Sequence, residues 1–515
     1  MAQWRRVTRT LGAASAVGAL GYTVDESNSH ILSRSLRVFS TGIQVAVDFR
    51  QNLKPIERDA PEYKSALQAF NLRTASRLLD VCFQNGGIYT KFGQQLSTFN
   101  HALPREFTDT MAKLQDQAKS VSFEEAMATV EQELQRPWRE VFPEINETPL
   151  AAASLAQVHE ATDYKGRRVA VKVQYPHLAR QMTADLVVMR WAFELTEWFF
   201  PNVQITWMFP EFQAALESEL NFVNEKQNSR RIAELMRHNP NVHVPIVYDD
   251  ISSKRLLVME FIDAPKISNV EKLKEESIDP SEVARVLCEV FGEMVFCHGF
   301  VHCDPHPGNI FVRKNPNANA TSKSQLVLLD HGLYRHLDED FRKTYCDLWR
   351  AMILRDSDLL QDCGRRLNAG PFTTYLPLLF TYRPLGSNTP LASKMSLDER
   401  EKLTEELRKL QVTDVNGFIQ HLPRDMLFVF RTNNMIRALN KDLGGSTRDR
   451  FASMAHFAVE GHALYHGATA QQHMSSWLVY YWDRVNMILH LRVFDWALRA
   501  IQLVRGEQVT DHRSG

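Results

Sequence analysis

The spacing of hydrophobic and polar positions changes along this chain from a helical period to a strand-like one and back. Helical spacing fills residues 32–136, and its breaks are Pro55, Pro61, Gly86 and Pro104. Strand-like spacing follows over residues 141–173. Beyond it we predict helices at 183–200 and 280–300, strands at 255–263 and 326–329, and mostly helices after residue 341. This pattern predicts an α+β protein.

Two short polar motifs lie beside predicted strands. Residues 302–309 read His-Cys-Asp-Pro-His-Pro-Gly-Asn, and residues 330–332 read Asp-His-Gly. This order and spacing is typical of a kinase phosphotransfer site. Asp304 fits the carboxylate that orients or deprotonates the attacking oxygen, while Asn309 and Asp330 fit the groups that hold Mg²⁺ against the phosphates of ATP. A polar loop that happens to carry two acids would explain one motif but not both.

A third motif lies upstream. Residues 169–172 read Val-Ala-Val-Lys, which resembles the strand whose lysine pairs with the α- and β-phosphates of ATP. Residues 155–162 and a turn at Gly166 complete a predicted β-hairpin. Glu225 is the best candidate for the helix glutamate that holds Lys172, but other glutamates lie nearby and a solvated helix acid is the plain alternative.

The turn expected to cover the phosphates is rich in alanine, where protein kinases place glycines. It contains Ala151, Ala152, Ala153 and Ser154. A Cβ disfavours positive φ and limits how closely the backbone approaches phosphates. We expect a stiffer loop with altered nucleotide handling, or else only a small-residue strand end.

The apolar run at residues 255–263 is expected to lead into a hinge between two lobes. Met259 would border the adenine pocket, and backbone groups near Glu260 and Phe261 would bind adenine. Met259 could equally be an ordinary core residue, since core residues also line pockets. The motifs together predict a bilobal, protein-kinase-like α+β fold with a helical N-terminal extension and a helical C-terminal region.

These residues resemble the UbiB-like family of atypical kinases, also called aarF-domain-containing kinases. The family's Lys-x-Gly-Gln motif is matched by Lys91, Gly93 and Gln94. The resemblance implies that this segment gates the site where a peptide substrate would bind, and that its lysine pairs with a Glu-x-Asp motif. Glu219 matches that motif, but Asn221 replaces its aspartate. Without the resemblance, a solvated polar helix face would be the preferred interpretation.

The resemblance implies an ATP- and Mg²⁺-dependent atypical kinase or ATPase at the mitochondrial inner membrane that supports lipid or quinone homeostasis and membrane organisation. A membrane lipid or lipid-soluble substrate and membrane-protein partners would follow. The segment after residue 332 is short and lacks Ala-Pro-Glu, and Cys303 stands where many protein kinases carry arginine. Both features favour ATPase or small-molecule kinase chemistry. A pseudokinase scaffold and a protein Ser/Thr kinase remain alternatives.

Composition restricts the partners and the location. The 515 residues include 60 Lys and Arg and 61 Asp and Glu, so net charge favours no nucleic-acid partner. Six cysteines without a C-x-x-C pair suggest neither zinc nor a disulfide framework. The first 24 residues carry arginine and hydroxyl groups but no acid, which is typical of a mitochondrial targeting segment. The apolar run at 11–24 is short for a span, which needs about 20 residues, so a tilted anchor and a cleaved leader both fit.

The predicted domains follow from these segments. They are a targeting segment or anchor at residues 1–30, a helical extension at 31–140, a kinase-like core at 141–385 and a helical C-terminal region at 386–515.

Overall fold

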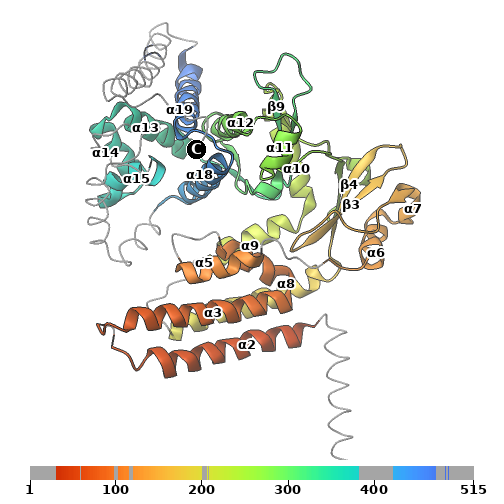
Figure 1. The fold of residues 1–515 in the computed structure, drawn as a ribbon, viewed down its shortest axis with the longest axis vertical. Coiled ribbons are helices and arrows are strands. Elements are labelled where there is room, and N and C mark those ends of the chain that lie inside the picture. Colours follow the sequence, from red (N-terminus) through yellow and green to blue (C-terminus); the bar gives the residue numbers. More distant parts are fainter. Residues whose placement is uncertain are drawn as a thin grey trace, which may run out of the picture. The chain divides into compact units, whose positions relative to one another are not determined.

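The computed structural model describes residues 30–57, 59–97, 103–114, 120–199, 208–381 and 422–470, with Thr206, Trp482 and Val485 (Figure 1). The predicted segment 1–30 therefore lies almost wholly outside the described residues, as does much of the predicted region 386–515. Packing divides the chain into two compact units. The first comprises residues 1–224 and 246–261, and the second comprises residues 225–245 and 262–515. The predicted extension and the predicted hairpin thus share one unit.

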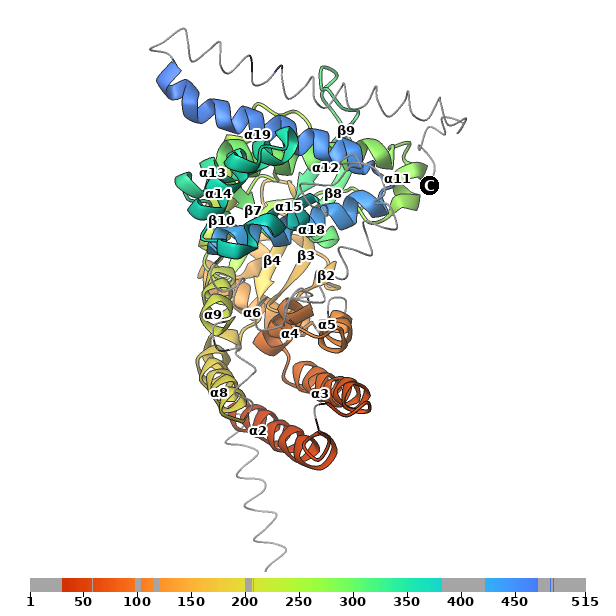
Figure 2. The same ribbon diagram turned by 90° about the vertical axis from the view of Figure 1, so that its left-hand side faces the viewer.

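Most of the first unit is helical. The helix breaks predicted at Pro55, Pro61, Gly86 and Pro104 are present, and a further break that was not predicted precedes the helix that begins at Phe123. Gly86 separates two helices with a φ of 62°, a conformation that glycine adopts at little cost. Helix α2 packs against α8, as Figure 2 shows. The helices are α2 (Ile31–Asp48), α3 (Tyr63–Asn85), α4 (Gly87–Ser97), α5 (Arg105–Met111), α6 (Phe123–Leu134), α7 (Trp138–Val141), α8 (Leu178–Phe199) and α9 (Met208–Glu219), with the π-helical turn η1 (Phe49–Leu53) and the 3₁₀ turn η2 (Ala112–Leu114).

The strands of the first unit form one antiparallel sheet in the order β1-β3-β4-β6, and β2 pairs with β3. The predicted hairpin is confirmed as β3 and β4, which Gly166 joins with a φ of 75°. Alternate β4 residues Val169, Val171 and Val173 are fully buried, as a sheet with one core face requires. The strands are β1 (Glu144–Ile145), β2 (Ala151–Ala152), β3 (Ala156–Thr162), β4 (Arg168–Gln174) and β6 (Leu256–Glu260). The 3₁₀ turn η3 (Asp249–Ile251) precedes β6.

The second unit contains two small sheets beside a large helical core. Strand β9 pairs in parallel with β5 and antiparallel with β8, while β7 pairs antiparallel with β10. The predicted buried strand before residue 330 is confirmed, since all five residues of β9 are buried. The strands are β5 (Val242–His243), β7 (Phe300–His302), β8 (Ile310–Lys314), β9 (Ser324–Leu328) and β10 (Tyr334–His336).

Helix α19 lies along both α12 and α13 and completes the core of the second unit (Figure 1). The helix predicted at 280–300 ends as an α-helix at Glu293 and continues as a π-helical turn. The helices are α10 (Phe222–Leu235), α11 (Val270–Glu275), α12 (Pro280–Glu293), α13 (Glu339–Leu354), α14 (Ser357–Arg366), α15 (Leu376–Thr381), α18 (Arg424–Asp442) and α19 (Thr447–Ala470), with the turns η4 (Met294–His298), η5 (Pro307–Asn309) and η6 (Gly370–Tyr375). Among the described residues, none of these helices is long and apolar enough to cross a membrane.

Candidate active site

Three polar residues predicted for phosphotransfer lie near one edge of the second unit's strands. Asp304 follows β7, Asn309 directly precedes β8, and Asp330 follows β9. Because β8 and β9 are antiparallel, the start of one strand lies beside the end of the other. The Leu329 amide donates a hydrogen bond to the Asn309 carbonyl at 2.8 Å, and Asn309 Nδ2 donates to the Asp304 backbone carbonyl at 3.2 Å. The fold thus brings the three motif positions together.

The backbone at Asp330 adopts an uncommon conformation. Its φ is 54°, in the left-handed region that aspartate tolerates better than most residues. Its Oδ1 accepts a hydrogen bond from the Gly332 amide at 3.3 Å, and its side chain is exposed. Such conformations persist only where the surrounding structure holds them, and they cluster at functional sites.

A buried histidine supports the loop before Asp304. His302 is fully buried, and burial lowers its pKa, although Asp304 and Asp330 act in the opposite direction. As a neutral ring, its Nδ1 accepts from the Asp304 amide at 3.2 Å, while its Nε2 faces the Leu329 carbonyl at 3.4 Å. Tyr334 stacks on the ring at 5.0 Å. His302 therefore connects the segments that carry the two acids.

Arg431 is a site residue that sequence reasoning missed. It projects from α18, and its Nη2 lies 3.5 Å from Asp304 Oδ1. No spacing signal could have found it, because only packing brings α18 to this loop. The contact places a positive charge beside the predicted catalytic carboxylate.

The donor groups at this edge suit Mg²⁺, which prefers oxygen ligands and usually keeps several of its waters. Asp330 offers an exposed carboxylate, and Asn309 offers an amide oxygen. Two protein ligands are enough for an ion that also binds phosphates. The assignment of these two residues as metal ligands stays a prediction.

The predicted phosphate-binding lysine lies in the middle of the first unit's sheet. Lys172 is on β4 between β3 and β6, opposite Val158 and Leu257. Its Nζ lies 5.2 Å from the ring centroid of Phe222, the first residue of α10. Glu225 follows three residues later in the first helical turn and is buried. Their pairing stays a prediction.

The alanine-rich segment consists of a short strand followed by a hydrogen-bonded turn. Residues Ala151–Ala152 form β2 and pair with β3, so these two alanines belong to a strand end, as the alternative interpretation expected. The Ala153 amide donates to the Ala156 carbonyl at 2.8 Å, and the Tyr175 hydroxyl donates to the Ala153 carbonyl at 2.9 Å. Ser154 at the tip is buried. These bonds hold the loop closely, and its expected stiffness stays a prediction.

The predicted hinge residues end β6, and the first unit stops at Phe261. Met259 is partly buried and packs against a small apolar cluster, so its core role is present. The Glu260 amide donates to the Ile246 carbonyl at 2.8 Å, and the Phe261 amide donates to the Arg168 carbonyl at 3.3 Å. Both amides are therefore already engaged within the first unit.

The Lys-x-Gly-Gln segment lies on α4 within the helical part of the first unit. Lys91 Nζ is 2.6 Å from Glu219 Oε1, so the implied ion pair is present. Gln94 Nε2 donates to the Leu114 carbonyl at 2.9 Å. A Cβ on Gly93 would lie 2.2 Å from Leu114 Cδ1, which explains why glycine stands there. The segment is therefore packed against its neighbours in the first unit and does not form a solvated helix face.

Asn221, which replaces the aspartate of the Glu-x-Asp motif, has a structural role. Asn221 Oδ1 accepts a hydrogen bond from the Val223 amide at 3.2 Å, just where α10 begins. Asparagine and aspartate cap helix N-termini about equally well. The substitution therefore keeps the cap while removing one negative charge near Glu219.

The segment after Gly332 is as short as the sequence predicted. It runs directly into β10, and α13 begins at Glu339, capped by the Asp338 carboxylate, which accepts from the Asp340 and Phe341 amides. The chain therefore offers no long loop here.

The first unit has an antiparallel sheet that carries Lys172, and the second unit has Asp304 and Asp330 just after the ends of strands. Together these features define a kinase-like protein. Residues 113–363 match the family described as ABC1 atypical kinase-like domain. AarF domain-containing protein kinase 1 of Mus musculus is 33% identical over 463 residues, 89% of this chain and 87% of the mouse protein. The chain therefore belongs to the ABC1, or AarF-domain, atypical kinase-like family, which confirms the resemblance.

Two further similarities complete the comparison. Secreted RxLR effector protein 27 of Plasmopara viticola is 59% identical over 218 residues, 42% of this chain and 93% of that protein. Among solved structures, the Rv3197–erythromycin complex from Mycobacterium tuberculosis is 21% identical, with a TM-score of 0.50 over 78% of this chain and 99% of that one. The structural match supports the fold alone. The predicted kinase-like α+β fold is thereby confirmed.

Proposed function

We propose that this chain is an atypical kinase or ATPase that uses ATP and Mg²⁺. The observation that carries the proposal is the joining of Asp304, Asn309 and Asp330 at one strand edge through the Asn309 hydrogen bonds. Phosphoryl transfer depends mainly on positioning and on stabilising charge, and such an edge can supply both.

Each residue has a distinct part in the proposed reaction. Asp304 accepts a proton from the attacking hydroxyl or water, or orients it, and Asn309 keeps the Asp304 backbone in place. Asn309 and Asp330 would hold Mg²⁺, which neutralises charge on the phosphates when bound. Lys172 contacts the α- and β-phosphates and is held by Glu225.

Adenine would be recognised by the backbone at the end of β6. The Glu260 and Phe261 amides already donate to Ile246 and Arg168, so other backbone groups near these two residues would bind adenine. Met259 would line the pocket. Ala151, Ala152, Ala153 and Ser154 would cover the phosphates with a loop that moves little.

We further propose a location at the mitochondrial inner membrane, with a role in lipid or quinone homeostasis. Two neighbouring helices of the first unit support membrane contact, because α2 and α8 expose large apolar side chains. They are Leu32, Leu36, Ile43, Val47, Val187, Trp191, Leu195, Trp198 and Phe199. Tryptophan suits the membrane–water interface, since its ring is apolar and its N–H is polar. A membrane lipid or lipid-soluble acceptor and membrane-protein partners follow from this location.

The Lys-x-Gly-Gln segment of α4 would then regulate access to the proposed active site. The Lys91–Glu219 pair and the tight packing at Gly93 hold α4 against α9 and the 3₁₀ turn after α5. We propose that this segment limits access of peptide substrates. The short segment after Gly332 leaves little support for general protein phosphorylation.

The test is ATP hydrolysis by the full chain with Mg²⁺, with and without liposomes of inner-membrane composition, beside Asp330→Asn. Asparagine also tolerates the left-handed φ, so this variant should keep its fold. We expect lipid-stimulated turnover that the substitution abolishes. Unchanged hydrolysis in Asp330→Asn would refute the proposed metal site. Turnover without any response to lipid would refute the membrane role alone.

A second function, a nucleotide-binding scaffold, is favoured by one observation. Arg431 lies 3.5 Å from Asp304, so the carboxylate proposed to accept the proton is already engaged in an ion pair. Nucleotide-dependent thermal stabilisation without turnover, in the wild type and in Arg431→Met alike, would support the scaffold. Turnover that increases in Arg431→Met would instead show that Arg431 restrains an active enzyme.

A further inference from the structure

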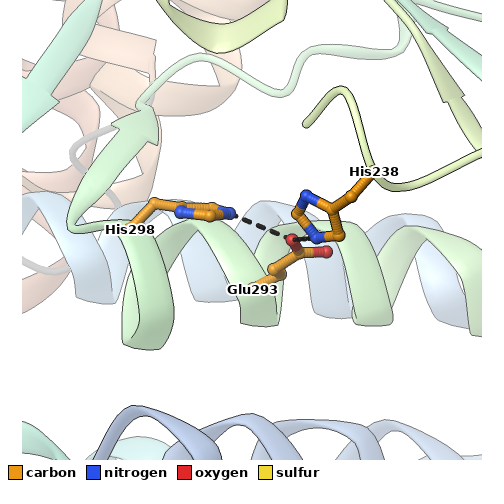
Figure 3. A group of neighbouring side chains, drawn as sticks. All are labelled: His238, Glu293 and His298. Carbon is orange, nitrogen blue, oxygen red and sulfur yellow. Dashed lines mark hydrogen bonds and ion pairs between the residues drawn. The ribbon is translucent and has the colours of Figure 1, made fainter. Parts of the chain in front are cut away.

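Two histidines and a glutamate of the second unit converge away from the predicted Mg²⁺ ligands (Figure 3). Glu293 Oε1 lies 2.7 Å from His238 Nε2 and 3.0 Å from His298 Nε2. Both imidazole rings point toward the carboxylate, and the three donor atoms lie within 4.8 Å of one another. His238 comes from the segment after α10, whereas Glu293 and His298 flank the end of α12.

A π-helical turn creates this convergence. Glu293 is the last residue of α12, and η4 runs from Met294 to His298. In an α-helix, residues five apart point about 140° from each other, because each residue turns the chain by about 100°. The i→i+5 bonding of a π-helix brings such residues onto one side, and π turns often occur at functional sites. The π-helical turn therefore brings Glu293 and His298 onto one side of the helix.

The glutamate is held in one orientation. Glu293 is only 5% exposed, and Asn239 Nδ2 donates to its Oε2 at 2.8 Å. That bond leaves Oε1 facing the two histidines. A second group that orients a ligand in this way is a regular feature of metal sites.

We propose that His238, Glu293 and His298 bind a divalent transition-metal ion, for which Zn²⁺ is the best fit. Two imidazoles and one carboxylate form a known zinc donor set. With metal–ligand bonds of about 2.0–2.1 Å, tetrahedral ligand atoms lie about 3.3 Å apart, slightly farther than the distances here. The exposed side chain of His238 can retreat by that amount, and solvent can supply the fourth ligand.

The neighbouring thiol does not complete the site. Cys297 lies between the ligands in sequence, but its Sγ faces the Phe457 carbonyl and is not among the donor atoms that converge here. The donor set is therefore two nitrogens and one oxygen from the protein.

The ion would brace the two strands that serve the catalytic edge. His238 precedes β5, which pairs with β9, and β9 leads to Asp330. His298 precedes β7, which leads to Asp304. Binding should therefore raise the thermal stability of the second unit without taking part in chemistry. This inference does not depend on the proposed function.

The experiment titrates Zn²⁺ alone into the metal-stripped full chain against a chromophoric chelator, with Co²⁺ absorption as a report of tetrahedral geometry. The test variant is His238→Asn, because an exposed side chain can change without unfolding the protein. The matched control is His456→Asn, which breaks a surface His456–Glu460 pair of 3.3 Å that belongs to no three-ligand group among the described residues. Asp330→Asn controls for the predicted Mg²⁺ site.

We expect one Zn²⁺ per chain, with affinity lowered at least about tenfold in His238→Asn, the smallest loss typical of changes around a metal site. The Co²⁺ band should disappear in that variant and persist in His456→Asn and Asp330→Asn. Equal Zn²⁺ affinity in the wild type and His238→Asn would overturn the proposal. Absence of stoichiometric binding in the wild type would overturn it as well and leave a hydrogen-bonded trio.

Discussion

The catalytic edge of the second unit and the Lys-x-Gly-Gln helix of the first both carry short polar motifs, but different forces hold them. At the edge, backbone hydrogen bonds position side chains such as Asp330, which stays exposed. On α4, Gly93 is buried against Leu114, and Lys91 is paired with Glu219. Substitutions at the edge should therefore change chemistry with little loss of stability, and substitutions on α4 should do the reverse.

The largest expected effect is on chemistry. Asp304→Asn should lower ATP turnover about 10²–10⁴-fold, the usual contribution of a general base. The thermal midpoint should change little, because the Asn309 bond is to the Asp304 backbone. Steady-state hydrolysis and thermal unfolding of the same preparation measure both. A large drop in stability together with turnover would contradict the comparison.

The opposite result is expected on α4. Gly93→Ala should destabilise the first unit by about 1–3 kcal/mol, since its Cβ would overlap Leu114 in a packed core. Gly42→Ala is the matched control, because no atom lies within 4 Å of its added Cβ on helix α2. The control should be neutral or stabilising by up to about 1 kcal/mol. Equal destabilisation in the two variants, measured by denaturant unfolding, would show that packing at Gly93 is not special.

Ion pairs around one buried carboxylate make the extension sensitive to acid. Hydrogen bonds from Arg73, then Arg77 and Asn52, lower the pKa of the buried Asp48 against the effect of burial, while the two arginines stay partly exposed. Because the folded pKa is depressed, these ion pairs stabilise fully above about pH 4 and lose their contribution as pH falls through the folded pKa. Asp48→Asn should cost about 1–2 kcal/mol at neutral pH.

Unfolding free energies measured from pH 7 to pH 2 test this expectation. The difference between the wild type and Asp48→Asn should shrink below about pH 4, where aspartate in the unfolded chain becomes protonated. A difference that stays constant across this range would contradict it.

The Lys91–Glu219 pair should contribute less. Both side chains are partly exposed, so a double-mutant cycle of Lys91→Met and Glu219→Gln should give a coupling of about 0.5–1 kcal/mol. The coupling should decrease in high salt because the pair is screened. A coupling indistinguishable from zero would leave packing at Gly93 as the main support of α4.

The smallest change is expected at the alanine loop. Ala153→Gly should alter ATP or ADP affinity by a few-fold, because glycine relaxes the backbone while the Ala153 hydrogen bonds can remain. Isothermal titration of both nucleotides measures it. Identical affinities in the variant and the wild type would reduce the loop to a small-residue strand end.

Local patterns in the sequence were sufficient where function depends on neighbours along the chain. The apolar run before Asp330 predicted a buried strand, Gly166 predicted the hairpin turn, and both are present. Resemblance to a family was needed for Lys91 and Glu219, since their residues alone favoured a solvated face. The helix predicted to reach residue 300 was wrong at its end, because propensity does not show where α-bonding changes to π-bonding.

The sequence by itself thus determined the order of elements, the kinase-like motifs and the family, because hydrophobic period and residue spacing act over short distances. Only the tertiary structure decided that Arg431 lies beside Asp304 and that His238 meets Glu293 and His298. Arg431 is distant from Asp304 along the chain, and His238 is distant from Glu293 and His298. Their meeting depends on helix packing and on one π turn, and neither leaves a periodic signal in the sequence.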